Sequence, residues 1–88
     1  MKVEFDESFY KRLTKIKDRS VLEKVKETIL QVEQAQNIHE IMNITKMEGF
    51  KSFFRIRIGD FRIGVELVED TIWFITVANR KDIYKKFS

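Results

Sequence analysis

Residues 53–68 read FFRIRIGDFRIGVELV, and this stretch decides the fold. On both sides of Gly59-Asp60, apolar and polar residues alternate with a period of two, as in a β-strand with one buried face. A glycine at the first position of a two-residue turn favours a type II′ hairpin. The sequence therefore predicts two antiparallel strands, over residues 53–58 and 61–67, joined by Gly59-Asp60.

The turn also fixes the register of the predicted hairpin. Stepping outward from it, Arg57 faces Arg62 and Arg55 faces Gly64. One face of the hairpin then carries only apolar residues and is expected to form the core. The other face carries three arginines, two of them directly opposite each other, although like charges at opposite positions destabilise a sheet.

A third strand extends this arrangement. Glu69-Asp70 predicts a second tight turn, and residues 71–78 follow as a uniformly apolar strand. Counting outward from this turn places Arg62 opposite Val77. Arg80 then lies just past the end of the strand, close to the first turn. The sequence therefore predicts that four arginines gather on one face and corner of the sheet.

Two helices precede the hairpin. Asp6 can cap a helix that runs to about Lys17, in which apolar residues recur at helical spacing. Ser20 and Glu23 have the spacing of a capping box at the start of a second helix. Two amphipathic helices joined by a short turn form a helical hairpin, and we expect this hairpin to cover the apolar face of the sheet.

Three shorter segments complete the chain. Residues 2–5 alternate as a short strand, residues 37–45 predict one helical turn followed by a linker, and residues 80–87 predict a short basic helical tail. No repeat or low-complexity stretch divides the sequence. We therefore expect a single α+β domain over residues 1–88, with a small antiparallel β-sheet and two N-terminal helices packed on one of its faces.

The composition excludes several classes of site. The 88 residues include no cysteine, no proline and one histidine, so disulfides, thiolate nucleophiles and cysteine- or histidine-based metal sites are excluded. The longest apolar run, Ile72–Ile75, is far shorter than the ~20 residues of a membrane span. The N-terminal residues lack the apolar region of a secretory signal. The sequence thus predicts a cytoplasmic protein without a cofactor.

The arginine-bearing face has two possible interpretations. The formal net charge of +3 comes entirely from residues 46–88, and a face of this kind can simply be the solvated side of an antiparallel sheet. Several arginines with Glu66 as the nearby acid are also a common way of binding phosphate, because each guanidinium offers a bidentate fork. Trp73, on the same face, could stack on a base or pack under the C-terminal tail.

Three segments together resemble a known family. Residues 47–49 (MEG), 54–63 (FRIRIGDFRI) and 79–84 (NRKDIY) are similar, in order and separation, to the RelE/ParE superfamily of bacterial toxins from toxin–antitoxin modules. The resemblance extends over nearly the whole chain. It implies a small antiparallel sheet with two N-terminal helices on one face, in agreement with the pattern of the residues.

For the RelE branch the resemblance implies an activity. Such toxins enter the ribosomal A site and cleave mRNA, with the RNA 2′-hydroxyl as nucleophile and without a metal. The resemblance assigns the catalytic roles to Arg62, Arg80 and Tyr84. The residues expected to bind flanking RNA phosphates are Arg55, Arg57 and Lys81.

The resemblance also implies partners: a cognate antitoxin, the ribosome and mRNA, with operator DNA bound only through the antitoxin and no membrane. The chain departs from the family pattern where Phe54 and Phe61 replace a frequent tyrosine and Asn79 replaces a frequent histidine. Arginine does not serve as a base, so the general base is unassigned. Two alternatives stay open: a ParE-like inhibitor of DNA gyrase, and an inactive member that only binds antitoxin and operator DNA.

Overall fold

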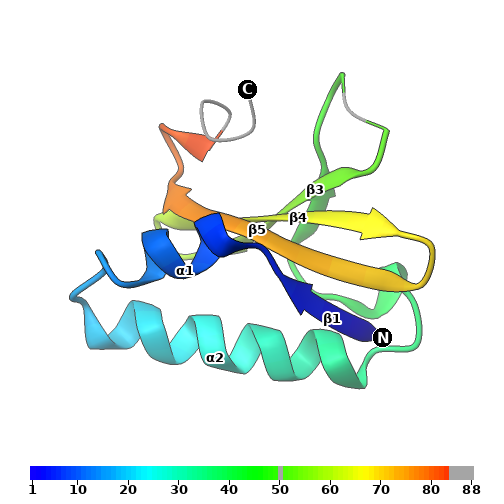
Figure 1. The fold of residues 1–88 in the computed structure, drawn as a ribbon, viewed down its shortest axis with the longest axis horizontal. Helices are drawn as coiled ribbons and strands as arrows, with labels where there is room; N and C mark the ends of the chain where they lie inside the picture. The colour runs from blue at the N-terminus through cyan, green and yellow to red at the C-terminus, as the bar shows by residue number, and fades with distance from the viewer. Residues whose placement is uncertain (50, 84–88) are drawn as a thin grey trace.

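The computed structural model describes residues 1–49 and 51–83. Within them the chain forms two α-helices, one 3-10 turn and five strands (Figure 1). In chain order these are β1 (Lys2–Phe5), α1 (Glu7–Leu13), α2 (Arg19–Gln34), a 3-10 turn (Ile38–Glu40), β2 (Ile44–Lys46), β3 (Phe53–Ile58), β4 (Phe61–Val68) and β5 (Thr71–Asn79). The predicted α+β class is confirmed.

All five strands belong to one sheet in the order β1-β5-β4-β3-β2. The three hairpin pairings are antiparallel, but β1 runs parallel to β5. The sheet is therefore mixed, whereas a purely antiparallel sheet was expected. The sequence prediction rested on tight turns, which join antiparallel strands. No tight turn joins β1 to β5, because the long segment from Asp6 to Asp70 lies between them, and such a connection allows parallel pairing. Strand β2 also replaces part of the linker that was predicted over residues 37–45, and the helical turn predicted there is the 3-10 turn.

The register of the β3–β4 hairpin is the predicted one. Arg57 pairs with Arg62 and Arg55 with Gly64. Gly59 has φ 66°, which suits the first position of a type II′ turn because a side chain at that φ is strained. The prediction that Arg62 faces Val77 is wrong: Arg62 faces Ala78, because an irregularity of the β-bulge type between Gly64 and Val65 shifts the register by one residue.

The helices begin and end differently from the prediction. Asp6 caps α1 as expected, and its side chain accepts the backbone N–H of Ser8 at 3.0 Å. However, α1 ends at Leu13, and residues 14–18 connect it to α2. Asp18 rather than Ser20 is the N-cap of α2, because its carboxylate accepts the backbone N–H of Ser20 at 2.9 Å. Ser20 thus lies inside the helix.

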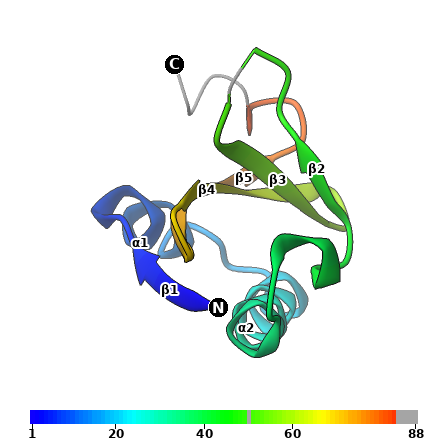
Figure 2. The same cartoon turned by 90° about the vertical axis from the view of Figure 1, so that its right-hand side faces the viewer.

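Both helices contribute to one hydrophobic core on the same side of the sheet (Figure 2). Phe9 of α1 and Val25 of α2 are buried there with apolar residues of β3, β4 and β5. The prediction that both helices pack against the apolar face of the sheet is confirmed by this shared core. Among the described residues, no helix is both long enough and apolar enough to cross a membrane.

A second, smaller group of buried residues lies outside this core. Met47 and Ile83 are 0% and 1% exposed, and Ala78 is also buried, yet none of them joins the main cluster. Ala78 faces Arg62 across the sheet and so shares its face. The β2–β3 connection and the segment after β5 lie on the side of the sheet away from α2 (Figure 1). The face that carries the arginines is therefore partly covered at its ends.

Candidate functional site

Four arginines form the arginine face, a name used here for Arg55, Arg57, Arg62 and Arg80. Strand β3 contributes the first two and β4 the third. The fourth follows β5 directly. Alternation along the hairpin puts the three strand arginines on the side opposite the main core. The sheet thus brings together four guanidinium groups from three separate segments of the sequence.

The backbone of Arg80 is held against the β3–β4 turn. Its N–H donates to the carbonyl of Asp60 at 2.9 Å. This contact confirms the prediction that Arg80 lies beside the Gly59-Asp60 turn. Although the bulge shifts the β5 register, the end of the strand still reaches the turn, because Phe61 pairs with Asn79, the residue before Arg80.

The Arg62 side chain is held by hydrogen bonds to the backbone of the β3–β4 turn region. Its Nη1 donates to the carbonyls of Gly59 at 2.8 Å and Phe61 at 2.9 Å. The side chain is therefore folded back along the turn and partly buried. Both bonds use the same nitrogen, so the guanidinium has further N–H groups with which it can bind a ligand.

The charges of the arginine face act on one another. Burial lowers the pKa of Arg62 below its ordinary value, and the nearby positive charges of Arg57, Arg55 and Arg80 lower it further, while Asp60 opposes this effect. Within residues 1–49 and 51–83, no carboxylate forms an ion pair with Arg57, Arg62 or Arg80. Repulsion among the positive charges around Arg62 favours the binding of an anion beside it.

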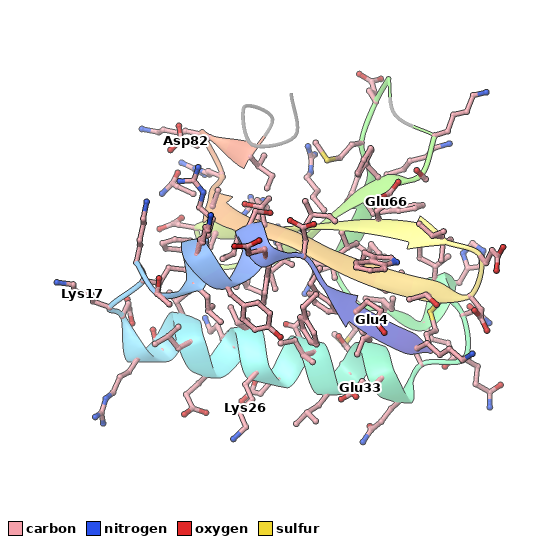
Figure 3. All side chains as sticks on the ribbon, viewed as in Figure 1. Glu4, Lys17, Lys26, Glu33, Glu66 and Asp82 are labelled. Atoms are coloured by element: carbon pink, nitrogen blue, oxygen red, sulfur yellow. The ribbon has the colours of Figure 1, made fainter. Side chains whose placement is uncertain are left out.

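Glu66 is the acidic residue that the sequence places on the two hairpin strands, near their arginines. Its carboxylate accepts a hydrogen bond from the hydroxyl of Ser52 at 3.3 Å. It also pairs with Trp73 across β4 and β5, as the sequence predicted. Glu66 lies along β4, away from the β3–β4 turn (Figure 3). The positive charge near the turn is therefore left uncompensated by Glu66.

Two hollows adjoin the arginine face. The smaller, of about 320 Å³, is lined by Asn43, Thr45, Arg55, Arg57 and Arg62. The larger, of about 610 Å³, runs between the β3–β4 turn and α2 and includes Arg57, Arg62 and Arg80 in its lining. Both volumes are of the size that holds a small ligand or part of a polymer.

The remaining predicted residues fall elsewhere. Lys81 is exposed, and its backbone N–H donates to the Asn79 side chain at 3.1 Å. Lys81 lines neither of the two hollows. The prediction for Tyr84 and the second half of the helical tail predicted over residues 80–87 lie outside the described residues. The structure thus brings together four of the predicted residues.

Asn43 and Thr45 line the smaller hollow but were not predicted as site residues. Asn43 has φ 62°, and its carbonyl accepts the backbone N–H of Arg57 at 3.1 Å. Asparagine is one of the few residues that readily adopts this left-handed conformation. The available signal for a bend into an edge strand was an asparagine directly before the two β-branched residues Ile44 and Thr45.

The chain is similar to known toxins over nearly its whole length. A family model described as "ParE toxin of type II toxin-antitoxin system, parDE" matches residues 3–84. The chain is 34% identical over 88 residues to the toxin RelE3 of Methanocaldococcus jannaschii, and the match covers 99% of both proteins.

Solved structures show the same fold. The RelB-RelE antitoxin-toxin complex from Methanococcus jannaschii contains a chain with 30% identity and a TM-score of 0.82, and the match covers 97% of this chain and 99% of that one. A chain of the intact Escherichia coli RelBE toxin-antitoxin complex has 21% identity and a TM-score of 0.69, with coverage of 89% and 94%. The second match is evidence for the fold alone.

Proposed function

Since this chain belongs to the RelE/ParE superfamily of toxins from type II toxin–antitoxin systems, we propose that it is an endoribonuclease that inhibits translation by cleaving mRNA in the ribosomal A site. The observation that carries this proposal is the arginine face. Three of its members have no carboxylate in ion-pair contact within the described part of the chain, and all four gather at the β3–β4 turn or along β3. A phosphodiester backbone supplies the missing negative charge.

The proposed reaction uses the RNA 2′-hydroxyl as nucleophile. Its oxygen forms a bond to the adjacent phosphorus and loses a proton, while the bond from phosphorus to the 5′-oxygen breaks and that oxygen gains a proton. The products are a 2′,3′-cyclic phosphate and a 5′-hydroxyl. The phosphorane between them carries more negative charge than the ground state, so fixed positive charge lowers the barrier.

Each arginine then has a proposed role. Arg62, whose guanidinium is held by two turn carbonyls, binds the scissile phosphate. Arg80 stabilises the leaving 5′-oxygen or donates the proton that this oxygen gains. The residues that hold flanking phosphates are Arg55, Arg57 and Lys81. Tyr84 orients the nucleophile or stacks on a base. Since an arginine does not act as a base, the proton acceptor is a group outside the arginine face, and the ribosome can provide it.

We also propose a protein partner. The solved complex from Methanococcus jannaschii pairs a RelE toxin with its RelB antitoxin, and by analogy a cognate antitoxin binds this chain. An acidic or amphipathic segment that covers the arginine face would neutralise it. Operator DNA is then bound only through the antitoxin, and the complex acts in the cytoplasm.

The family model favours a second candidate function, because it describes a ParE toxin. A ParE-like inhibitor of DNA gyrase would bind its target without cleaving RNA. In that case Arg62 and Arg80 would tolerate replacement by alanine. An inactive member that only binds antitoxin and operator DNA is a third candidate, and it would not arrest growth when expressed alone.

The test is 5′-end mapping of an mRNA in a purified translation reaction. The reaction is run with the wild-type chain, with Arg62→Ala and with Arg80→Ala, after circular dichroism has shown that both variants are folded. The control is Lys26→Ala, which removes a positive charge from the outer side of α2. Cleavage that requires ribosomes and is lost in both arginine variants supports the proposal. Intact mRNA with the folded wild-type protein bound to ribosomes overturns it, and gyrase supercoiling is then the next assay.

A further inference from the structure

The two hollows beside the arginine face share part of their lining. Both are lined by Asn43, Arg57 and Arg62. From these shared residues the smaller hollow extends over the sheet towards Arg55. The larger one passes around the β3–β4 turn and reaches α2 on the other side of the sheet, where Lys24 is part of its lining. A ligand longer than one nucleotide that binds at the shared residues can contact both hollows.

Lys24 extends the positive charge beyond the sheet. It lies in the second turn of α2 and its side chain is exposed. Its Nζ is 3.9 Å from the position that a Cβ on Gly59 would occupy, so the ammonium group reaches the β3–β4 turn from the helix. Among the described residues Lys24 forms no ion pair, although its charge helps to lower the pKa of Asp18 after the larger effects of the Ser20 hydrogen bonds.

The charge of the larger hollow remains positive when its acids are included. Its cationic side chains are Lys24, Arg57, Arg62 and Arg80, and its carboxylates are Glu27 and Asp60. Four positive and two negative groups leave a surplus of two positive charges. Gln31 and Met42 add polar and apolar contact area suited to a sugar or a base. This mixture favours a nucleic-acid strand over a compact inorganic anion.

We propose that Lys24 binds a backbone phosphate of RNA, so that the strand passes from the arginine face around the Gly59-Asp60 turn onto α2. The inference rests on the proposed function and adds a contact on a second structural layer. The phosphate that Lys24 binds flanks the reacting one, so Lys24 takes no part in bond breaking.

The test measures binding of a short, fluorescently labelled single-stranded RNA with 2′-methoxy groups, which prevent cleavage. Fluorescence anisotropy gives the affinity of the wild-type chain and of Lys24→Ala over a range of salt concentrations. We expect Lys24→Ala to bind roughly five- to tenfold more weakly, whatever the RNA sequence, and to reduce the salt slope by about 0.7, the value for one lost phosphate contact on a single strand. Lys24→Arg should restore the affinity.

Lys26→Ala is the matched control. Lys26 lies two residues further along α2, and its side chain points away from the sheet (Figure 3). It lines neither hollow. Equal affinities of Lys24→Ala and Lys26→Ala, with binding lost in Arg62→Ala, would overturn the role of Lys24 and leave the proposed function intact. An Arg62→Ala variant that binds this RNA as tightly as the wild type would contradict the RNA-binding role of the arginine face itself.

A second arm separates the two sources of RNA phosphate. The same variants are titrated onto ribosomes that carry no mRNA. Weakening with the free oligonucleotide assigns Lys24 to the mRNA, and weakening with the empty ribosome alone assigns it to ribosomal RNA. The first result supports the proposal. The second overturns it, because the phosphate bound by Lys24 would then not belong to the strand that lies on the arginine face. The variants are also titrated with an acidic peptide. If Lys24→Ala loses affinity for this peptide and for neither RNA, the larger hollow is a protein-binding site and the proposal is overturned.

Discussion

Arg57 and Arg62 lie directly opposite each other across β3 and β4, and neither has a carboxylate in ion-pair contact among residues 1–49 and 51–83. Like charges at opposite positions of a sheet reduce stability. Burial and the neighbouring arginines also lower the pKa of Arg62, which reports the same repulsion. The repulsion therefore makes the hairpin less stable than its apolar face alone would, and an anion bound between the two arginines would offset this loss.

Replacement of Arg57 by threonine is expected to stabilise the free protein. Arg57→Thr removes the repulsion and keeps a residue with high strand propensity, so the free energy of unfolding should rise by about 0.5 kcal/mol. Urea denaturation at low ionic strength measures it. The gain should shrink at high salt, because screening weakens the repulsion in the wild type. Arg57→Lys keeps the charge and serves as control: an equal gain in that variant would contradict the electrostatic explanation.

The hydroxyl of Thr76 is buried and has no hydrogen-bond partner in the described part of the chain. Thr76→Val replaces it by a methyl group of similar shape, so we expect the free energy of unfolding to rise by about 1 kcal/mol. Thr28→Val is the matched control, because the Thr28 hydroxyl donates to the Lys24 carbonyl at 2.7 Å. Thermal denaturation of both variants should show a higher midpoint for Thr76→Val only.

The cap of α1 should make stability depend on pH in the acid range. Hydrogen bonds from the Ser8 side chain and backbone lower the pKa of Asp6 below 3.8. Since the pKa is lower in the folded state, the charged cap stabilises the fold above pH 3.8 and this contribution is lost as the pH falls through the folded value. Asp6→Asn keeps a good N-cap without this titration.

The measurement is urea denaturation of wild type and Asp6→Asn at about pH 6 and about pH 2. The wild type should lose more stability than the variant on acidification. Asp18, whose pKa is lowered by Ser20 in the same way, is present in both proteins and cancels in the comparison. Identical losses would show that Asp6 contributes no pH-dependent stability.

Substitution of Met47 measures how much a buried residue outside the main core contributes to stability. Its side chain is 0% exposed although it lies outside the main core. Met47→Ala should lower the free energy of unfolding by about 2–5 kcal/mol because it leaves a cavity. Met47→Leu conserves volume and should cost less than about 1.5 kcal/mol. A loss below about 1 kcal/mol in Met47→Ala would mean that Met47 adds little to the fold.

Local sequence patterns predicted the β3–β4 hairpin because every step depends on near neighbours. Alternation sets the faces, and the glycine at position 59 sets the turn and the register. The Asp6 cap follows from a residue type and a contact two residues away. The convergence of Arg57, Arg62 and Arg80 was therefore predictable before the fold was known.

The β4–β5 register, the cap of α2 and the position of Lys24 depend on contacts that cannot be recognised from the local sequence. Residues 71–78 are almost uniformly apolar, so no alternation reveals that one residue is added opposite the Gly64/Val65 step. Asp18 and Ser20 are both good capping residues, and the competition between them is settled only by the backbone of the connection. In the sequence, Lys24 is one of several charged residues on an exposed helix face. Its position beside Gly59 follows from the packing of α2 against the sheet.

The parallel pairing of β1 with β5 bears on how the protein is made. Phe5 pairs with Phe74, which follows it by 69 residues (74 − 5). At about 5–20 residues per second, β1 therefore waits roughly 3–14 s on the ribosome before its partner strand has been synthesised. Until then the sheet is incomplete, and Arg80 has not yet joined the turn. Translation itself thus delays the assembly of the arginine face until β5 and Arg80 have been synthesised.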